Sequence, residues 1–134
     1  MKISSKGITA IKLFIDLGEH YEEGFISLID VAKRKEVSKK FLEQIVPFYK
    51  NSGLLLGKGG NQGGYRLAKA PNEISLFDIL SLSESIFAPV GSGSSPIDEA
   101  FAKADRWLEE YLSSVTLDKL VEQQVESYSN SWSI

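Results

Sequence analysis

Residues 27–67 constrain the fold of this chain more than any other part of it. They contain two short amphipathic stretches, each preceded by a serine, and then two short apolar stretches around a glycine-rich loop. Helical spacing behind a serine predicts a capped helix, and apolar stretches around glycines predict a β-hairpin. Two helices joined by a tight turn and followed by a hairpin are the layout of a winged helix-turn-helix, whose second helix can enter a DNA major groove.

Serine residues mark the starts of the two predicted helices. Ser27 precedes a helix over 28–35, and Ser38 precedes a second helix that we expect to run to about residue 52. Pro47 lies inside the second pattern and predicts a kink, because proline lacks a backbone N–H. The apolar stripe of the second helix consists of Phe41, Leu42, Ile45, Phe48 and Tyr49.

Polar side chains in the first two turns of the second helix fall largely off this stripe, so we expect them to face outward. They are Ser38, Lys39, Lys40, Glu43 and Gln44. Glutamine can pair with adenine, glutamate can accept a hydrogen bond from cytosine, and lysine can bind guanine or phosphate. The pattern predicts a base-reading surface, with an ordinary solvated helix face as the alternative.

The loop between the two apolar stretches holds five glycines in residues 57–64. It lacks the phosphate-binding and dinucleotide-binding motifs, and a strand rather than a helix is expected after it. In a wing, these glycines would allow positive φ and a close approach to DNA. The side chains suited to phosphates or minor-groove edges are Lys58, Asn61, Gln62 and Arg66. A solvated hairpin turn is the alternative.

The two halves of the chain carry opposite charge, although the net charge is only −3. Residues 1–69 hold twelve Lys and Arg against seven Asp and Glu, whereas residues 70–134 hold three against eleven. A basic half can meet phosphates while an acidic half faces away from them. Chance segregation on a solvated surface is the alternative.

Composition removes several classes of chemistry. The chain has no cysteine, which excludes disulfides, thiol catalysis and cysteine-ligated metals. Its single histidine, His20, is expected on the surface, and no nucleophile and base stand in a catalytic pattern, so we expect neither an enzyme nor a cofactor. No apolar run approaches the roughly 20 residues of a membrane span, and the start lacks the apolar region of a signal peptide. A cytoplasmic location is the expectation.

The rest of the chain is predicted to be mostly helical. We expect a helix over 5–21, another over 75–86, a flexible loop over 87–94, a long helix from Ser95, a short helix from Thr116 and a frayed end over 127–134. The long helix carries apolar residues near heptad spacing, namely Ile97, Phe101, Ala104, Leu108, Tyr111 and Val115. The prediction is a mainly α fold with a small β-hairpin, divided into a winged helix-turn-helix over 1–86, the loop, and a C-terminal part over 95–134.

Several stretches resemble the Rrf-two (Rrf2) family of bacterial winged-helix transcriptional regulators. The matching stretches are 1–7, 27–32, 38–45, 51–55, 63–68, 74–80 and 116–120. The resemblance implies a base-reading helix that begins at Ser38, wing contacts near 58–64, and an approach of Ser5 and Lys6 to the DNA backbone. It also implies a homodimer formed through the long helix over 95–114.

The function implied by this resemblance is sequence-specific regulation of transcription, as a repressor on a pseudo-palindromic operator. Because the chain has no cysteine, the expected signal is a small molecule, a partner protein, or none. A winged-helix adaptor that binds protein instead of DNA is the alternative. Cluster-binding members of the family carry three cysteines in the loop that corresponds to 90–95, which here reads Val-Gly-Ser-Gly-Ser-Ser. Thiolate ligation is impossible in this chain, so an iron–sulfur switch of that type is not expected.

Overall fold

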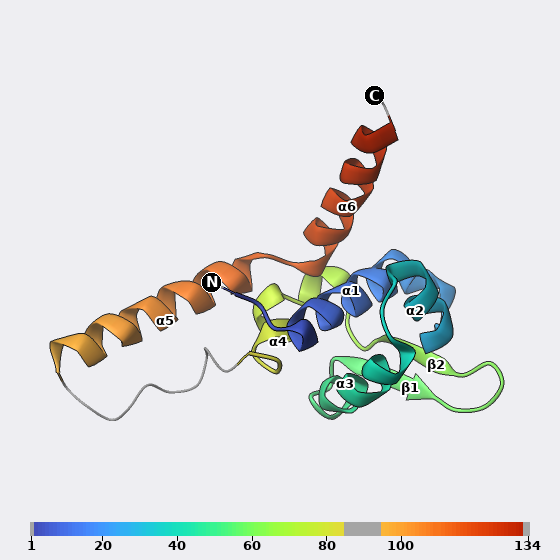
Figure 1. Ribbon diagram of the computed structural model, residues 1–134, viewed down its shortest axis with the longest axis horizontal. Helices are drawn as coiled ribbons and strands as arrows, with labels where there is room; N and C mark the ends of the chain where they lie inside the picture. Colours follow the sequence, from blue (N-terminus) through green and yellow to red (C-terminus); the bar gives the residue numbers. More distant parts are fainter. Residues whose placement is uncertain (1, 85–94, 133–134) are drawn as a thin grey trace.

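The computed structural model describes residues 2–84 and 95–132, and Figure 1 shows a helical body from which two C-terminal helices project. In chain order the elements are α1 (Ser5–Glu19), η1 (Tyr21–Glu23), α2 (Leu28–Lys35), α3 (Lys39–Asn51), β1 (Leu55–Lys58), β2 (Gly64–Leu67), η2 (Pro71–Glu73), α4 (Leu76–Leu80), α5 (Pro96–Ser114) and α6 (Leu117–Trp132). The two strands form one antiparallel hairpin. The predicted mainly α fold with a small hairpin is confirmed.

The centre of the core lies where α1 meets α3 and α4. Phe14 and Tyr49 are both fully buried, and their rings meet edge to face with centroids 5.0 Å apart. The Tyr49 hydroxyl donates a hydrogen bond of 2.7 Å to the carbonyl oxygen of Ile79, so this side chain also ties α3 to α4. Burial of the phenol raises the pKa of Tyr49 to about 12.

The helix-turn-helix has the capped starts that the sequence predicts. The Ser27 hydroxyl accepts the N–H of Asp30 at 3.2 Å, and the Ser38 hydroxyl accepts the N–H of Phe41 at 3.1 Å. Each bond satisfies a backbone donor that has no partner within its own helix. Glu36 between the helices adopts the left-handed conformation with φ of 54°, which turns the chain from α2 into α3.

A Schellman motif ends α3, which continues through Pro47. The N–H of Leu54 donates to the carbonyl of Tyr49 at 3.0 Å, and the N–H of Gly53 donates to the carbonyl of Lys50 at 3.1 Å. Gly53 has φ of 85°, a value that favours glycine. The motif leads the chain directly into β1.

A third backbone segment holds the hairpin to the body. Leu55 of β1 stands opposite Leu67 of β2, and both side chains are buried. On the other side of β2, Ile26 exchanges two backbone hydrogen bonds with Tyr65, at 2.9 and 2.8 Å. The wing is therefore fixed to the residues that lead into α2.

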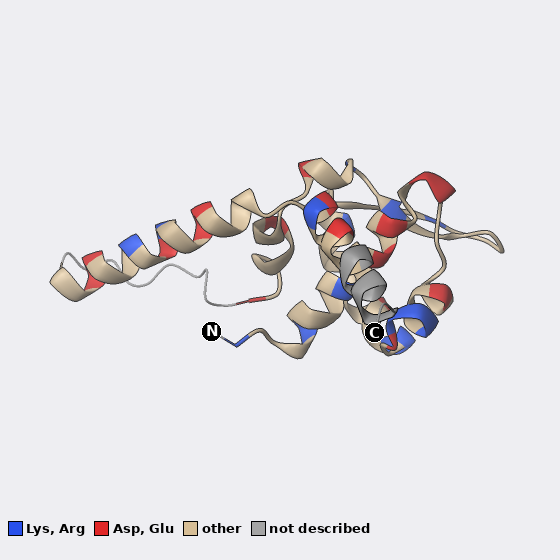
Figure 2. Ribbon diagram, turned by 90° about the horizontal axis from the view of Figure 1, so that it is seen from above, with Lys and Arg blue, Asp and Glu red and all other residues tan. Residues whose placement is uncertain are grey.

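The start of α6 belongs to the same core as α1. Leu117 is fully buried, and Val121 packs against the core. Two backbone hydrogen bonds of 2.8 Å fix the junction between α5 and α6: the N–H of Leu76 donates to Val115, and the N–H of Leu117 donates to Ile74. From this junction α5 projects away from the body (Figures 1 and 2).

The structure corrects the predicted lengths of two helices. α4 ends at Leu80 instead of continuing to residue 86, because the hydroxyls of Ser81 and Ser83 hydrogen-bond to nearby backbone carbonyls at 3.3 Å and compete with a regular helix. α6 runs to Trp132, whereas the sequence predicts a short helix with a frayed end. Packing of the first turns of α6 on α1 stabilises the longer helix. The predicted loop over 87–94 lies outside the described residues.

Candidate nucleic-acid interface

The first two turns of α3 present the side chains that the sequence assigns to base reading. Ser38, Lys39, Lys40, Glu43 and Gln44 are all exposed. Lys39 and Glu43, one turn apart, form a half-exposed ion pair of 3.2 Å. A pair of this kind contributes only about 0.3–0.5 kcal/mol, so a nucleic acid can separate it easily. Within the described part of the chain, Lys40 and Gln44 have no side-chain hydrogen bond or ion pair.

Later in α3 the structure corrects one predicted core residue. The side chain of Phe48 is 52% exposed, and Val46 is buried in its place. Val46 and Tyr49 fill the inward positions in this part of α3. With these two side chains pointing into the core, the helix is rotated so that Phe48 faces outward. The ammonium of Lys6 lies 3.9 Å from the centroid of the Phe48 ring, in cation–π contact. This contact brings the start of α1 to the exposed side of α3.

Glu84 fixes the first turn of α1. Its two carboxylate oxygens accept the backbone N–H and the hydroxyl of Ser4, each at 2.6 Å, and the same hydroxyl accepts the N–H of Gly7 at 3.1 Å. Burial raises the pKa of the Glu84 carboxyl, but the hydrogen bonds and the charge of Lys6 outweigh it and keep that pKa below its ordinary value. The backbone of Lys6 is therefore held in place.

Phe25 organises the charged side of the wing, and the sequence patterns did not identify it. The Lys58 ammonium lies 5.8 Å and the Arg66 guanidinium carbon 5.7 Å from the centroid of the Phe25 ring. Arg66 is half-buried, and its Nε has no hydrogen-bond partner in the described structure. Part of Arg66 thus packs inside the wing, while Asn61 and Gln62 are exposed in the loop.

Two glycines allow the tight turn and the close packing of the wing. A Cβ atom at Gly63 would lie 2.3 Å from the carbonyl oxygen of Lys58, and one at Gly64 would lie 2.2 Å from that of Ile26. Real Cβ atoms essentially never approach so closely, so both positions need glycine. Gly59, in contrast, faces open space with no atom within 4 Å of its Cβ position.

The predicted DNA-binding side chains form three groups: the first turns of α3, the wing, and Lys6 on Phe48. Figure 1 shows α3 and the hairpin on one side of the body, at the bottom of the view, with α6 at the top. β1 packs against α3. Among the residues described, no hydrogen bond, ion pair or ring contact links Lys39 or Lys40 to Lys58.

The predicted dimerisation residues lie on the projecting α5. Ile97, Phe101, Ala104 and Tyr111 are exposed, and Leu108 and Val115 are half-buried. Trp107 is a further exposed aromatic residue on this helix, with 62% of it accessible. Figure 2 shows charges of both signs along α5. Large exposed apolar side chains on one helix are typical of an interaction surface.

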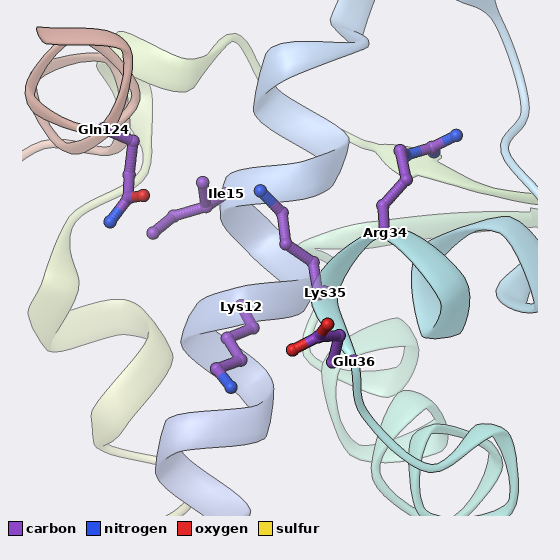
Figure 3. Close-up of a pocket in the computed structure, with 6 residues that line it drawn as sticks. All are labelled: Lys12, Ile15, Arg34, Lys35, Glu36 and Gln124. Carbon is purple, nitrogen blue, oxygen red and sulfur yellow. The ribbon is translucent and has the colours of Figure 1, made fainter. Parts of the chain in front are cut away.

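A surface cavity of about 240 Å³ lies between α1, the end of α2 and α6 (Figure 3). Its lining residues are Lys12, Ile15, Arg34, Lys35, Glu36 and Gln124. The Lys35 ammonium forms an ion pair of 2.5 Å with the Glu19 carboxylate. The Arg34 guanidinium points away from the cavity and binds Asp16. The cavity therefore offers no concentration of one sign of charge.

The donor set does not fit a cysteine-ligated cluster. The sequence has no cysteine, and among the described side chains of residues 2–84 and 95–124 no group of three His, Asp or Glu could hold a metal ion. No helix in the same residues has both the length and the apolar character needed to cross a membrane.

Comparison with known proteins gives consistent matches over nearly the whole chain. Residues 3–123 match the Rrf2 family, described as iron-dependent transcriptional regulators. The HTH-type transcriptional regulator CymR of Bacillus subtilis is 35% identical over 126 residues, which cover 90% of this chain and 89% of the relative. The HTH-type transcriptional regulator IscR of Pectobacterium carotovorum is 31% identical over 134 residues, covering 90% and 79%.

Solved structures agree with these sequence matches. T. potens IscR superimposes with a TM-score of 0.79 at 31% identity, covering 95% of this chain and 90% of that one. The B. subtilis CymR (YrzC) structure, described as the global cysteine regulator, gives a TM-score of 0.79 at 32% identity, covering 92% and 98%.

Proposed function

This chain belongs to the Rrf2 family of HTH-type transcriptional regulators, and we propose that it binds its operator as a homodimer with one α3 in each of two major grooves. A two-fold dimer reads two equivalent half-sites, so the operator would be pseudo-palindromic. We further propose that it is a cytoplasmic repressor without catalytic activity.

The observation that carries this proposal is the exposed start of α3. Lys40 and Gln44 lie one turn apart on the same side of the helix, and neither has a partner in the described structure. The Gln44 amide can donate and accept, as adenine recognition requires, and Lys40 can bind guanine or phosphate. Lys39 and Glu43 would exchange their mutual ion pair for phosphate and cytosine, and the Ser38 hydroxyl retains a hydrogen to donate.

Contacts outside the major groove would come from the wing and from the start of α1. Lys58, Asn61 and Gln62 are assigned to the flanking backbone or minor groove. Arg66 adds positive charge there, with its Nε engaged in packing. Lys6 is assigned to a phosphate, because its ammonium stands on the exposed side of α3.

The dimer would form through α5, whose apolar side chains project from the body. Ile97, at the start of the predicted heptad pattern, and Tyr111, near its end, are 67% and 66% exposed. Pairing two such helices would remove this apolar surface from water. Because the chain lacks thiolate ligands, we assign no cofactor and propose a small molecule or a partner protein as the effector.

Selection of bound fragments from a genomic library tests the function directly. We expect enrichment of one pseudo-palindromic sequence, with an affinity that falls about 10³–10⁵-fold between 50 and 200 mM salt if about 6–10 phosphates are contacted. Lys40→Ala should weaken this binding, whereas Lys12→Ala, on an exposed lysine at the cavity between α1 and α6, serves as the control. Equal affinity for the enriched sequence and a random duplex would contradict sequence-specific regulation.

A further inference from the structure

We infer that Phe48 is a positioning residue for Lys6: its exposed ring holds the Lys6 ammonium on the DNA-facing side of α3, where the ammonium binds a phosphate. This inference rests on the proposed function and deepens it, because it explains how a lysine on another helix becomes part of the same binding surface.

The place of Phe48 on α3 is the first argument. Lys40, Gln44 and Phe48 are spaced by four residues, so they follow one row along the exposed side of the helix. The half-exposed Phe48 ring at the end of this row presents one face that a cation can contact. Lys6 makes this contact, with its ammonium 3.9 Å from the ring centroid, well inside the range of a cation–π contact.

The second argument is that only the side chain of Lys6 remains to be oriented. Glu84 binds Ser4 through two hydrogen bonds of 2.6 Å, and this fixes the backbone at the start of α1. A lysine stem still has many rotamers. The Phe48 ring restricts them in the free protein, and a restricted side chain binds more tightly because less entropy is lost on association.

The Glu84 carboxylate competes with Phe48 for Lys6. The positive charge of Lys6 helps to keep the pKa of the Glu84 carboxyl below its ordinary value, so this carboxylate attracts the same ammonium away from the ring. The ring of Phe48 provides the competing contact on the α3 side. Without the ring, Lys6 would spend more time near Glu84 and less time where a phosphate lies.

A positioning role predicts an effect that does not depend on base sequence. If Phe48 itself touched a base, for example a thymine methyl group, its loss would change sequence preference. If it acts through Lys6 on a phosphate, its loss weakens cognate and random duplexes by the same factor.

A double-mutant cycle on the full-length protein tests this distinction. Lys6→Met removes the charge and retains the stem, Phe48→Leu removes the ring and retains an apolar side chain, and Phe48→Tyr retains the ring. Dissociation constants are measured by fluorescence anisotropy for the selected duplex and a random duplex at several salt concentrations. Thermal unfolding of each variant verifies that it folds.

We expect Phe48→Leu to weaken both duplexes equally, by about two- to five-fold for each protomer, and Phe48→Tyr to bind like the wild type. In the Lys6→Met background, Phe48→Leu should have no further effect, and Lys6→Met should lower the salt slope by about one for each protomer.

Three results would overturn the inference while leaving wild-type DNA binding intact: an unchanged affinity of Phe48→Leu, an equal effect of Phe48→Leu with and without Lys6, or a changed ratio between the two duplexes. A wild-type protein that binds neither duplex would instead refute the proposed function, and the inference with it.

Discussion

Arg34 binds the buried carboxylate of Asp16 in bidentate fashion: its Nε and Nη2 lie 2.9 Å from the two different carboxylate oxygens. Asp16 is fully buried in α1, and Arg34 stands in the last turn of α2. Two parallel charged hydrogen bonds restrict orientation as well as distance. The pair therefore fixes the first helix of the helix-turn-helix against α1.

Loss of this arginine should destabilise the fold. We expect Arg34→Met to lower the free energy of unfolding by about 2–3 kcal/mol, because the buried Asp16 carboxylate loses both hydrogen bonds from the guanidinium. Lys33→Met, on the exposed neighbouring residue, is the matched control and should change stability by less than about 0.5 kcal/mol. Urea unfolding monitored by circular dichroism measures both, and similar midpoints for the two variants would contradict the assignment.

Gln44 and Lys58 should affect DNA binding in different ways. Gln44→Ala removes a base-reading amide and should reduce the discrimination between operator and variant sequences by about 1–3 kcal/mol. Lys58→Ala removes a phosphate contact and should weaken all duplexes uniformly. Anisotropy titrations with cognate, mismatched and random duplexes distinguish the two effects. An equal loss on every duplex for Gln44→Ala would refute its base-reading role.

Gly64 and Gly59 form a matched pair within the wing. Gly64→Ala would place a Cβ atom against the Ile26 carbonyl, so we expect a loss of about 1–3 kcal/mol and a displaced wing. Gly59→Ala enters open space and should be close to neutral. Denaturant midpoints, together with the amide exchange of Tyr65, report the damage. If both variants unfold at the wild-type midpoint, the close approach of β2 to Ile26 is wrong.

The buried phenol of Tyr49 predicts a loss of stability in alkali. Burial raises its folded-state pKa from 10.0 to about 12, so the neutral form stabilises the fold below pH 10 and this contribution is lost as the pH rises toward 12. The slope should approach about 1.4 kcal/mol per pH unit. Tyr49→Phe, which also loses the Ile79 hydrogen bond and about 1 kcal/mol at neutral pH, should lack this added slope. If the free energy of unfolding falls equally steeply with pH in the wild type and in Tyr49→Phe, the raised pKa of Tyr49 is wrong.

The apolar side of α5 should control assembly. Phe101→Glu places a charge in the predicted dimer contact and should shift the protein toward a monomer by at least ten-fold in dissociation constant. Arg106→Glu, on the opposite side of the same helix, is the control. Sedimentation equilibrium measures the dissociation constants of both variants. An unchanged dimer in Phe101→Glu would show that the interface does not include this side of α5.

Features that depend on neighbouring residues could be predicted from the sequence. Ser27, Ser38, Ser75 and Ser95 each accept a hydrogen bond from the third residue of the helix that follows. A cap needs only a hydroxyl and a nearby N–H, so local sequence contains the necessary information. The glycine-rich hairpin was predictable for the same reason.

Features that join distant segments were not predictable. The helical stripe predicts a buried Phe48, but Val46 takes the inward position instead. The exposed Phe48 ring is then contacted by Lys6, which belongs to a different helix. The contact of Phe25 with the wing and the pairing of Asp16 with Arg34 likewise join separate elements. One amphipathic pattern does not determine the exact rotation of a helix in the core, and that rotation decides which side chains face outward.

The two backbone hydrogen bonds that join Leu76 to Val115 and Leu117 to Ile74 make the base of α5 a rigid bracket. If two protomers pair through α5, the angle between α5 and the body sets the distance between the two α3 helices. The α5–α6 junction would then determine the half-site spacing that the dimer accepts on its operator. A change at this junction would alter the accepted spacing without changing any side chain that contacts a base.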